Sequence, residues 1–161
     1  MNGGCARWLL VSACCLLAGC GYSTSTLLRQ DIRSISVPVF DNRTWYHGLE
    51  VELTRAVVEE VKLHTRLHFA PPGEADSALE GELVSFEQEA PVKTREQDIV
   101  LARVTVEVRF RWVDNLTRRD IVPRQSVRET QLYAVPLGGP PESLAFREVA
   151  KRIVEKMERD W

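Results

Sequence analysis

Cysteine is absent from residues 21–161, the part of this sequence that is long enough to fold into a domain. The chain of 161 residues has four cysteines, and none lies beyond Cys20. Residues 21–161 therefore offer no disulfide, no cysteine-ligated metal and no cysteine nucleophile. We expect no metal and no other cofactor.

The chain also lacks an excess of charge of one sign and the short motifs of several enzyme classes. Its 21 basic and 23 acidic residues give a formal net charge of −2, which argues against a partner held mainly by nucleic-acid phosphates. It contains no GxxxxGK[ST], GxGxxG, GxSxG or SxxK motif. It is too short for a TIM barrel. We expect no nucleic-acid partner and no enzymatic activity.

Long apolar runs are missing except near the N-terminus. The run Trp8–Ala18 follows the single charged residue Arg7. It is too short to span a bilayer, which needs roughly 20 residues, and this pattern is typical of a secretory signal peptide. We therefore predict an exported chain that does not itself cross a membrane.

The end of this apolar run has the sequence Leu17-Ala18-Gly19-Cys20, which resembles the bacterial lipobox. In lipoproteins the signal peptide is cut before that cysteine, which then carries the lipid. Two or three acyl chains make such an anchor stable. We predict a lipoprotein signal peptide over residues 1–19, lipidation of Cys20 and a Ser/Thr-rich tether over 20–30. The alternative is an ordinary signal peptide that ends at a coincidental cysteine.

Residues 31–161 are predicted to form a single α+β domain. Apolar and polar residues alternate over 34–39, which predicts a first strand, interrupted on one side by Pro38. The turn-like residues 41–44 follow. Apolar residues then recur at three- and four-residue spacing, which predicts a helix from Leu49 to about His64.

Three more strands and a second helix follow in the predicted domain. The clearest alternation in the chain runs over 103–112, where one face is apolar and the other polar. Weaker patterns predict a strand over 78–89 and an edge strand over 121–133. A polar connection is expected over 91–98, a hairpin loop over 114–119, and a helix that starts at Ser143 or a residue or two earlier.

The predicted order of elements is β-α-β-β-β-α. Each helix has a single apolar stripe and the best strand has a single apolar face. We therefore expect two helices packed on one face of a four-stranded, mainly antiparallel sheet. The opposite face of the sheet is expected to be polar and exposed to solvent, a ligand or a partner protein.

Several short segments, in order along nearly the whole mature chain, carry a resemblance to a known family. They are Gly19-Cys20-Gly21-Tyr22, Val37-Pro38-Val39-Phe40-Asp41-Asn42-Arg43-Thr44, Gly48-Leu49-Glu50, Leu53-Thr54-Arg55-Ala56-Val57, Ala75-Asp76 through Leu79 and Gly81, and Ile153-Val154, Met157-Glu158 and Trp161. Together they resemble the LPS-assembly lipoprotein family (LptE).

The resemblance implies an outer-membrane lipoprotein on the periplasmic face. Members of that family plug a large β-barrel, the LPS translocon called LptD, help it assemble and contact LPS. Gly21, rather than Asp, after the predicted lipidated cysteine favours sorting to the outer membrane under the same resemblance. Two alternatives stay open, an auxiliary periplasmic lipoprotein subunit of another envelope transport complex and an anchored hydrolase.

Five arginines are candidate contact residues. Guanidinium groups bind phosphate in a bidentate manner, so arginines on the polar strand face could contact lipid A phosphates or acidic groups in a barrel lumen. The alternative is a solvated face balanced by Glu107 and neighbouring acids. We predict ligand binding by Arg103, Arg109 and Arg111, and partner contact by the loop residues Arg118 and Arg119.

Trp45 and Tyr46, before the first helix, are candidate partner contacts because aromatic anchors dominate many interfaces. The alternative is that they cap the core. Asp41 and Asn42 are expected to make only turn and helix-entry bonds. Two remaining pairs, His64 with His68 and Glu80 with Glu82, lack the further groups that a metal or glycosidase site needs.

Overall fold

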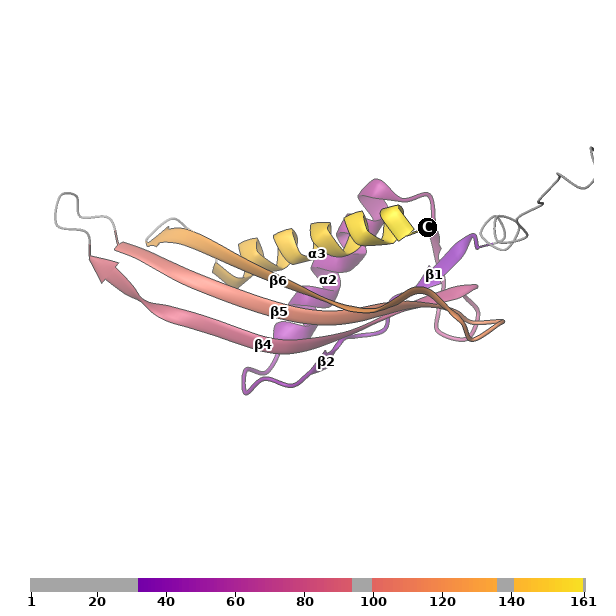
Figure 1. The fold of residues 1–161 in the computed structure, drawn as a ribbon, viewed down its shortest axis with the longest axis horizontal. Helices are drawn as coiled ribbons and strands as arrows, with labels where there is room; N and C mark the ends of the chain where they lie inside the picture. The colour runs from indigo at the N-terminus through magenta and orange to yellow at the C-terminus, as the bar shows by residue number, and fades with distance from the viewer. Residues whose placement is uncertain (1–31, 94–99, 136–140, 161) are drawn as a thin grey trace, which may run out of the picture. The chain divides into compact units, whose positions relative to one another are not determined.

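The computed structural model describes residues 32–93, 100–135 and 141–160, which fall within one compact unit that begins at Ile32. These ranges form an α+β fold (Figure 1). Its helices are α2 (Leu49–His64) and α3 (Pro141–Asp160). Its strands are β1 (Ser34–Ser36), β2 (Asp41–Asn42), β3 (His68–Phe69), β4 (Ser77–Lys93), β5 (Val100–Asp114) and β6 (Asp120–Val135).

The sheet is mixed. The long strands β4, β5 and β6 are antiparallel neighbours, whereas β1, β2 and β3 join in parallel. The strand order is β3-β1-β4-β5-β6, with β2 also on β4. The predicted α+β class is confirmed, but the count of four strands was wrong. The sequence did not predict β2 and β3, because a strand of two residues is too short to show an alternating pattern.

The alternation over 103–112 produces the inner face of β5. The side chains of Val104, Val106, Val108, Phe110 and Trp112 are all buried. Because successive side chains of a strand point to opposite faces, the polar residues between them lie on the other face of the sheet. The predicted two-faced strand is therefore confirmed.

The apolar stripes of both helices pack with the inner face of β5 in one hydrophobic core. The buried side chains of α2 include Leu53, Val57 and Val61, and α3 packs against α2, β5 and β6. α2 ends at His64 as predicted, and α3 begins at Pro141, where proline is tolerated in a first helical turn. The stripe of α3 buries Ala145, Phe146, Val149, Ala150, Ile153, Val154 and Met157.

The first predicted strand, over 34–39, ends at Ser36, and Asp41–Asn42, predicted as part of a turn, form the strand β2. Between the pairs Ser36–Ala78 and Asp41–Glu82, one side advances five residues and β4 advances four. The extra residue lies around Pro38, which has no N–H to give to a ladder. Phe40 is buried there, with its ring in the space that a side chain on Gly81 would need.

Other boundaries also differ from the predictions. β4 continues to Lys93, so the predicted connection over 91–98 was wrong for residues 91–93, and residues 94–99 lie outside the described ranges. His68 lies on β3, beyond the end of α2, so it does not share a helix face with His64. Within the described ranges, neither helix has the length and apolar character needed to cross a bilayer.

Candidate functional site

The polar face of the sheet carries the predicted arginine row, and the register of β4 against β5 determines its partners. Glu80 lies opposite Arg111, and Glu89 lies opposite Arg103. The Arg111 guanidinium approaches the Glu80 carboxylate at 2.7 Å, and Arg103 approaches Glu89 at 2.9 Å. Opposite charges at directly facing positions stabilise a strand pair modestly. Each of these arginines is thus held by an acid of β4.

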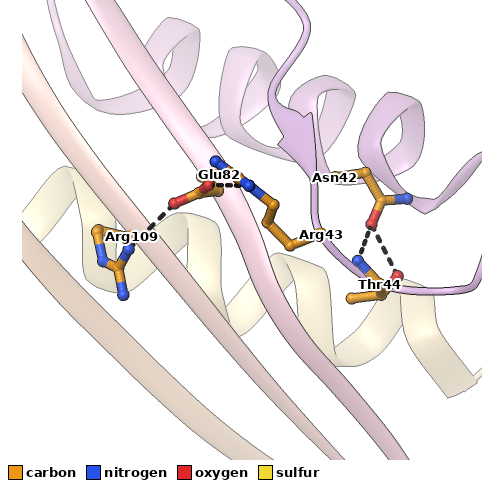
Figure 2. Close-up of polar contacts among 5 residues, drawn as sticks. All are labelled: Asn42, Arg43, Thr44, Glu82 and Arg109. Carbon is orange, nitrogen blue, oxygen red and sulfur yellow. Dashed lines mark hydrogen bonds and ion pairs between the residues drawn. The ribbon is translucent and has the colours of Figure 1, made fainter.

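Arg109 belongs to a three-residue cluster centred on Glu82. The Glu82 carboxylate accepts hydrogen bonds from Arg109 on β5 at 3.2 Å and from Arg43, just after β2, at 2.6 Å (Figure 2). The Glu82 side chain is only 16% exposed, whereas that of Arg43 is 72% exposed. One carboxylate therefore balances two guanidinium groups, and a positive charge is left at the surface.

A shallow depression of about 160 Å³ lies over this cluster. Arg124 also lines it and makes no ion pair with a described side chain. Arginines outnumber acids by one among the lining residues, which favours an anionic group at this place. The charged lining residues are Asp41, Arg43, Glu80, Glu82, Arg109, Arg111 and Arg124. The ligand role of Arg103, Arg109 and Arg111 stays a prediction.

The β5–β6 loop presents Arg118 and Arg119 to solvent. Asp114 orders this loop, because its carboxylate accepts hydrogen bonds from the N–H groups of Leu116 and Thr117. Arg118 has φ of 58°, in the left-handed region. Neither arginine pairs with a described acid, and their role in partner contact stays a prediction.

The predicted aromatic residues of the loop before α2 differ from each other. The Tyr46 ring meets the Phe86 ring edge to face at a centroid distance of 5.2 Å, so Tyr46 covers the core at this edge while staying half exposed. Trp45 is 95% exposed and contacts no other aromatic ring of the described residues. Tyr46 therefore caps the core in part, as the alternative predicted, whereas Trp45 does not cap it.

Asn42 holds this loop in shape. Its side-chain oxygen accepts hydrogen bonds from the N–H and the hydroxyl of Thr44 (Figure 2). Its NH₂ group donates to the Tyr46 carbonyl at 2.6 Å and to the Glu50 carboxylate at 2.7 Å. The Glu50 carboxylate also accepts a hydrogen bond from the N–H of Gly48. The φ angle of Gly48 is 93°, a conformation that glycine adopts without strain. The loop is therefore preorganised.

Hydrogen bonds to the Glu50 carboxylate lower its pKa, first from its own backbone N–H and then from the Asn42 amide. Asp76 is the second acid with a lowered pKa. The N–H of Arg33 and then the Ser34 hydroxyl stabilise its charged form. Asp76 thereby ties β1 to the start of β4, and its own N–H donates to the Ser34 hydroxyl at 2.8 Å.

Sequence reasoning missed Arg43, Glu50 and Asp76 as organising residues. The helix-entry position of Glu50 was a usable signal, since acids are favoured in a first helical turn. The other two depend on neighbours about 40 residues away in the chain, which no local pattern reveals. Among the described residues, no group of His, Cys, Asp and Glu is suited to hold a metal ion.

A further groove of about 490 Å³ lies between α2 and α3. The apolar residues Ala56, Leu63 and Phe146 line it, together with charged residues of both helices. The His64 imidazole at the end of α2 lies 3.0 Å from Glu60, which also lines the groove.

The described residues form an α+β domain with a charged sheet face and an aromatic loop that is ordered by Asn42 and Glu50. The family model for lipopolysaccharide assembly, LptE, matches residues 32–161. The chain therefore belongs to the LptE family. No curated protein matches its sequence.

Solved structures share the fold at low identity. The hypothetical protein CT253 from Chlamydia trachomatis has a TM-score of 0.56 and 12% identity, over 78% of this chain and 95% of that one. The PelC dodecamer from Paraburkholderia phytofirmans has a TM-score of 0.50 and 12% identity, over 78% of this chain and 86% of that one. At such identities the likeness concerns the fold alone.

Proposed function

We propose that this protein is an outer-membrane lipoprotein of the LPS export machinery, which binds inside the LPS translocon barrel and supports its assembly. The family match over residues 32–161 carries this proposal, because it spans all of the described residues. The contact surfaces of the domain support a role in binding, without catalysis. The partner is a barrel protein of the LptD kind.

The anchor is part of the same proposal. Residues 1–19 act as the signal peptide, Cys20 carries the lipid, and 20–30 link it to a single domain over 31–161. A multiply acylated cysteine holds a protein stably at a bilayer surface. The domain then enters the barrel from the periplasmic side of the membrane.

Direct contact with LPS is a second component. The net positive depression around Arg109 supports it, since lipid A phosphates are anions that guanidinium groups bind in a bidentate manner. Within the depression Arg109 and Arg111 are already paired with acids, so a phosphate would have to compete with Glu82 and Glu80. Arg43 is likewise paired with Glu82, so Arg124, which has no ion pair with a described side chain, gives the phosphate its additional attraction.

A pull-down of the tagged, lipidated protein from its native envelope in mild detergent tests the function. We expect mass spectrometry to recover a stoichiometric outer-membrane barrel of the LPS-export kind. A Cys20→Ala variant separates anchoring from binding. Recovery of an inner-membrane transport ATPase complex instead would refute the proposal and favour an auxiliary subunit of another transport system.

A further inference from the structure

β4 has an open edge beside the aromatic loop. On its outer side β4 pairs with β1 at Ser77 and Ala78 and with β2 at Glu82 and Leu83, and no described strand pairs with that side beyond Leu83. The last rung is the hydrogen bond from the Arg43 N–H to the Leu83 carbonyl, at 2.9 Å. β4 then runs on past the loop (Figure 1).

Asn42 is the reason that the edge opens here. Its side chain binds both groups of Thr44 and the Tyr46 carbonyl, so the chain turns away from β4 after a single further rung. The Tyr46 ring then packs on Phe86, three residues beyond Leu83. The loop therefore lies directly at the start of the open edge.

Two observations, independent of each other, mark this place as a docking surface. An edge strand presents unpaired backbone N–H and C=O groups that another strand can bind. Trp45 is 95% exposed on a loop whose order is already established by Asn42 and Glu50. Because the backbone of this loop is already ordered, binding through Trp45 costs little backbone entropy, and buried tryptophans are frequent anchors of interfaces.

The charge of Glu87 affects which kind of strand can pair with the open edge of β4. Glu87 is exposed on β4, opposite Thr105, and makes no ion pair with a described side chain. A charged residue on an edge strand discourages pairing with apolar or acidic strands. A basic residue on an incoming strand would find its partner there.

We propose that the edge of β4 from Val84 to Glu89, together with Trp45, receives an extended segment of the barrel partner. That segment places a basic residue opposite Glu87 and an apolar surface against Trp45 and Tyr46. This inference rests on the proposed function, because it names the part of the domain that meets the barrel. The edge lies beside the arginine row and meets it at Glu89, the partner of Arg103.

Photo-cross-linking in cells tests the proposal. p-Benzoylphenylalanine replaces Glu87 in the full-length lipidated chain, and the same group at Arg128, exposed on the opposite edge strand β6, is the matched control. We expect ultraviolet light to join the chain to the barrel far more efficiently from position 87 than from position 128. Equal cross-linking from both positions would refute the docking edge.

A binding measurement with the purified barrel in detergent supplies the second arm. We expect Trp45→Ala to weaken binding about tenfold or more, as for a tryptophan at the centre of an interface. Leu63→Ala removes an exposed apolar side chain from α2, away from the proposed edge, and should leave the affinity unchanged. Circular dichroism verifies that both variants fold.

The remaining outcomes separate this inference from the proposed function. If wild-type pull-down recovers the barrel but position 87 does not cross-link to it, the docking edge is wrong and the function stands. Cross-linking of position 87 to lipid, to a second copy of this chain or to another protein would also refute the docking edge. If no barrel is recovered at all, both proposals fail.

Discussion

The ring of Phe40 lies directly over Gly81, on the inner side of β4, where a Cβ on Gly81 would overlap with the ring. Phe40 itself is buried, and its N–H donates to the Thr54 hydroxyl at 3.0 Å. This contact joins the break between β1 and β2 to both β4 and α2. Because Gly81 has no side chain, the ring of Phe40 can lie against the backbone of β4.

Gly81→Ala is expected to destabilise the fold by about 1–3 kcal/mol, the usual cost of overpacking a core. Urea denaturation measures the loss. The double variant Gly81→Ala with Phe40→Leu should recover part of it, because the smaller side chain leaves space for the new methyl group. Strict additivity of the two single losses would contradict the contact.

Asn42→Ala is expected to loosen the loop that carries Trp45. The N–H of Thr44 loses its acceptor and Glu50 loses its amide donor. Hydrogen exchange at Thr44 and Gly48 should accelerate. Asp41→Ala, at the exposed neighbouring position, is the control and should leave both rates unchanged. Unchanged rates in Asn42→Ala would mean that the loop is ordered by other contacts.

Stability in acid should depend on Asp76. Its pKa in the folded protein lies below the ordinary value, because the Arg33 N–H and the Ser34 hydroxyl bind its charged form. Near pH 4, the ordinary carboxylate pKa, the unfolded chain therefore binds more protons than the folded one. The stabilisation is fully present above that pH and is lost as pH falls through the lower folded pKa.

Asp76→Asn is accordingly expected to lower the unfolding free energy at neutral pH, with a difference from wild type that shrinks below about pH 4. Denaturation series between pH 3 and 7 provide the comparison. Asp41→Asn, an exposed acid without a bonded side chain, serves as the control. A difference that stays constant across this range would show that the carboxylate charge is not what stabilises the contact.

Arg109 and Glu82 should have opposite effects on anion binding. Arg109→Ala removes a guanidinium group from the depression and should weaken LPS binding, whereas Glu82→Gln frees two arginines and should strengthen it. Arg109→Ala should change stability by less than about 1 kcal/mol, because that pair is partly exposed. Binding at low and high salt is the measurement. Equal LPS affinities of both variants and wild type would exclude this depression as the site.

Much of the fold follows from local patterns that the sequence displays. The alternation over 103–112 determines both faces of β5, since side chains of a strand alternate whatever lies beside them. The three- and four-residue spacing determines α2 and its end at His64. These features depend on near neighbours in the chain, so a single sequence suffices for them.

The tertiary structure alone decided which side chains meet. Glu82 binds Arg43 and Arg109, which lie 39 and 27 residues away in the chain, because strand order and register bring them together. The short parallel strands and the open edge of β4 follow from the same long-range packing. Charge and polarity on the outer face were visible in the sequence, but pairing across strands depends on a register that no local pattern contains.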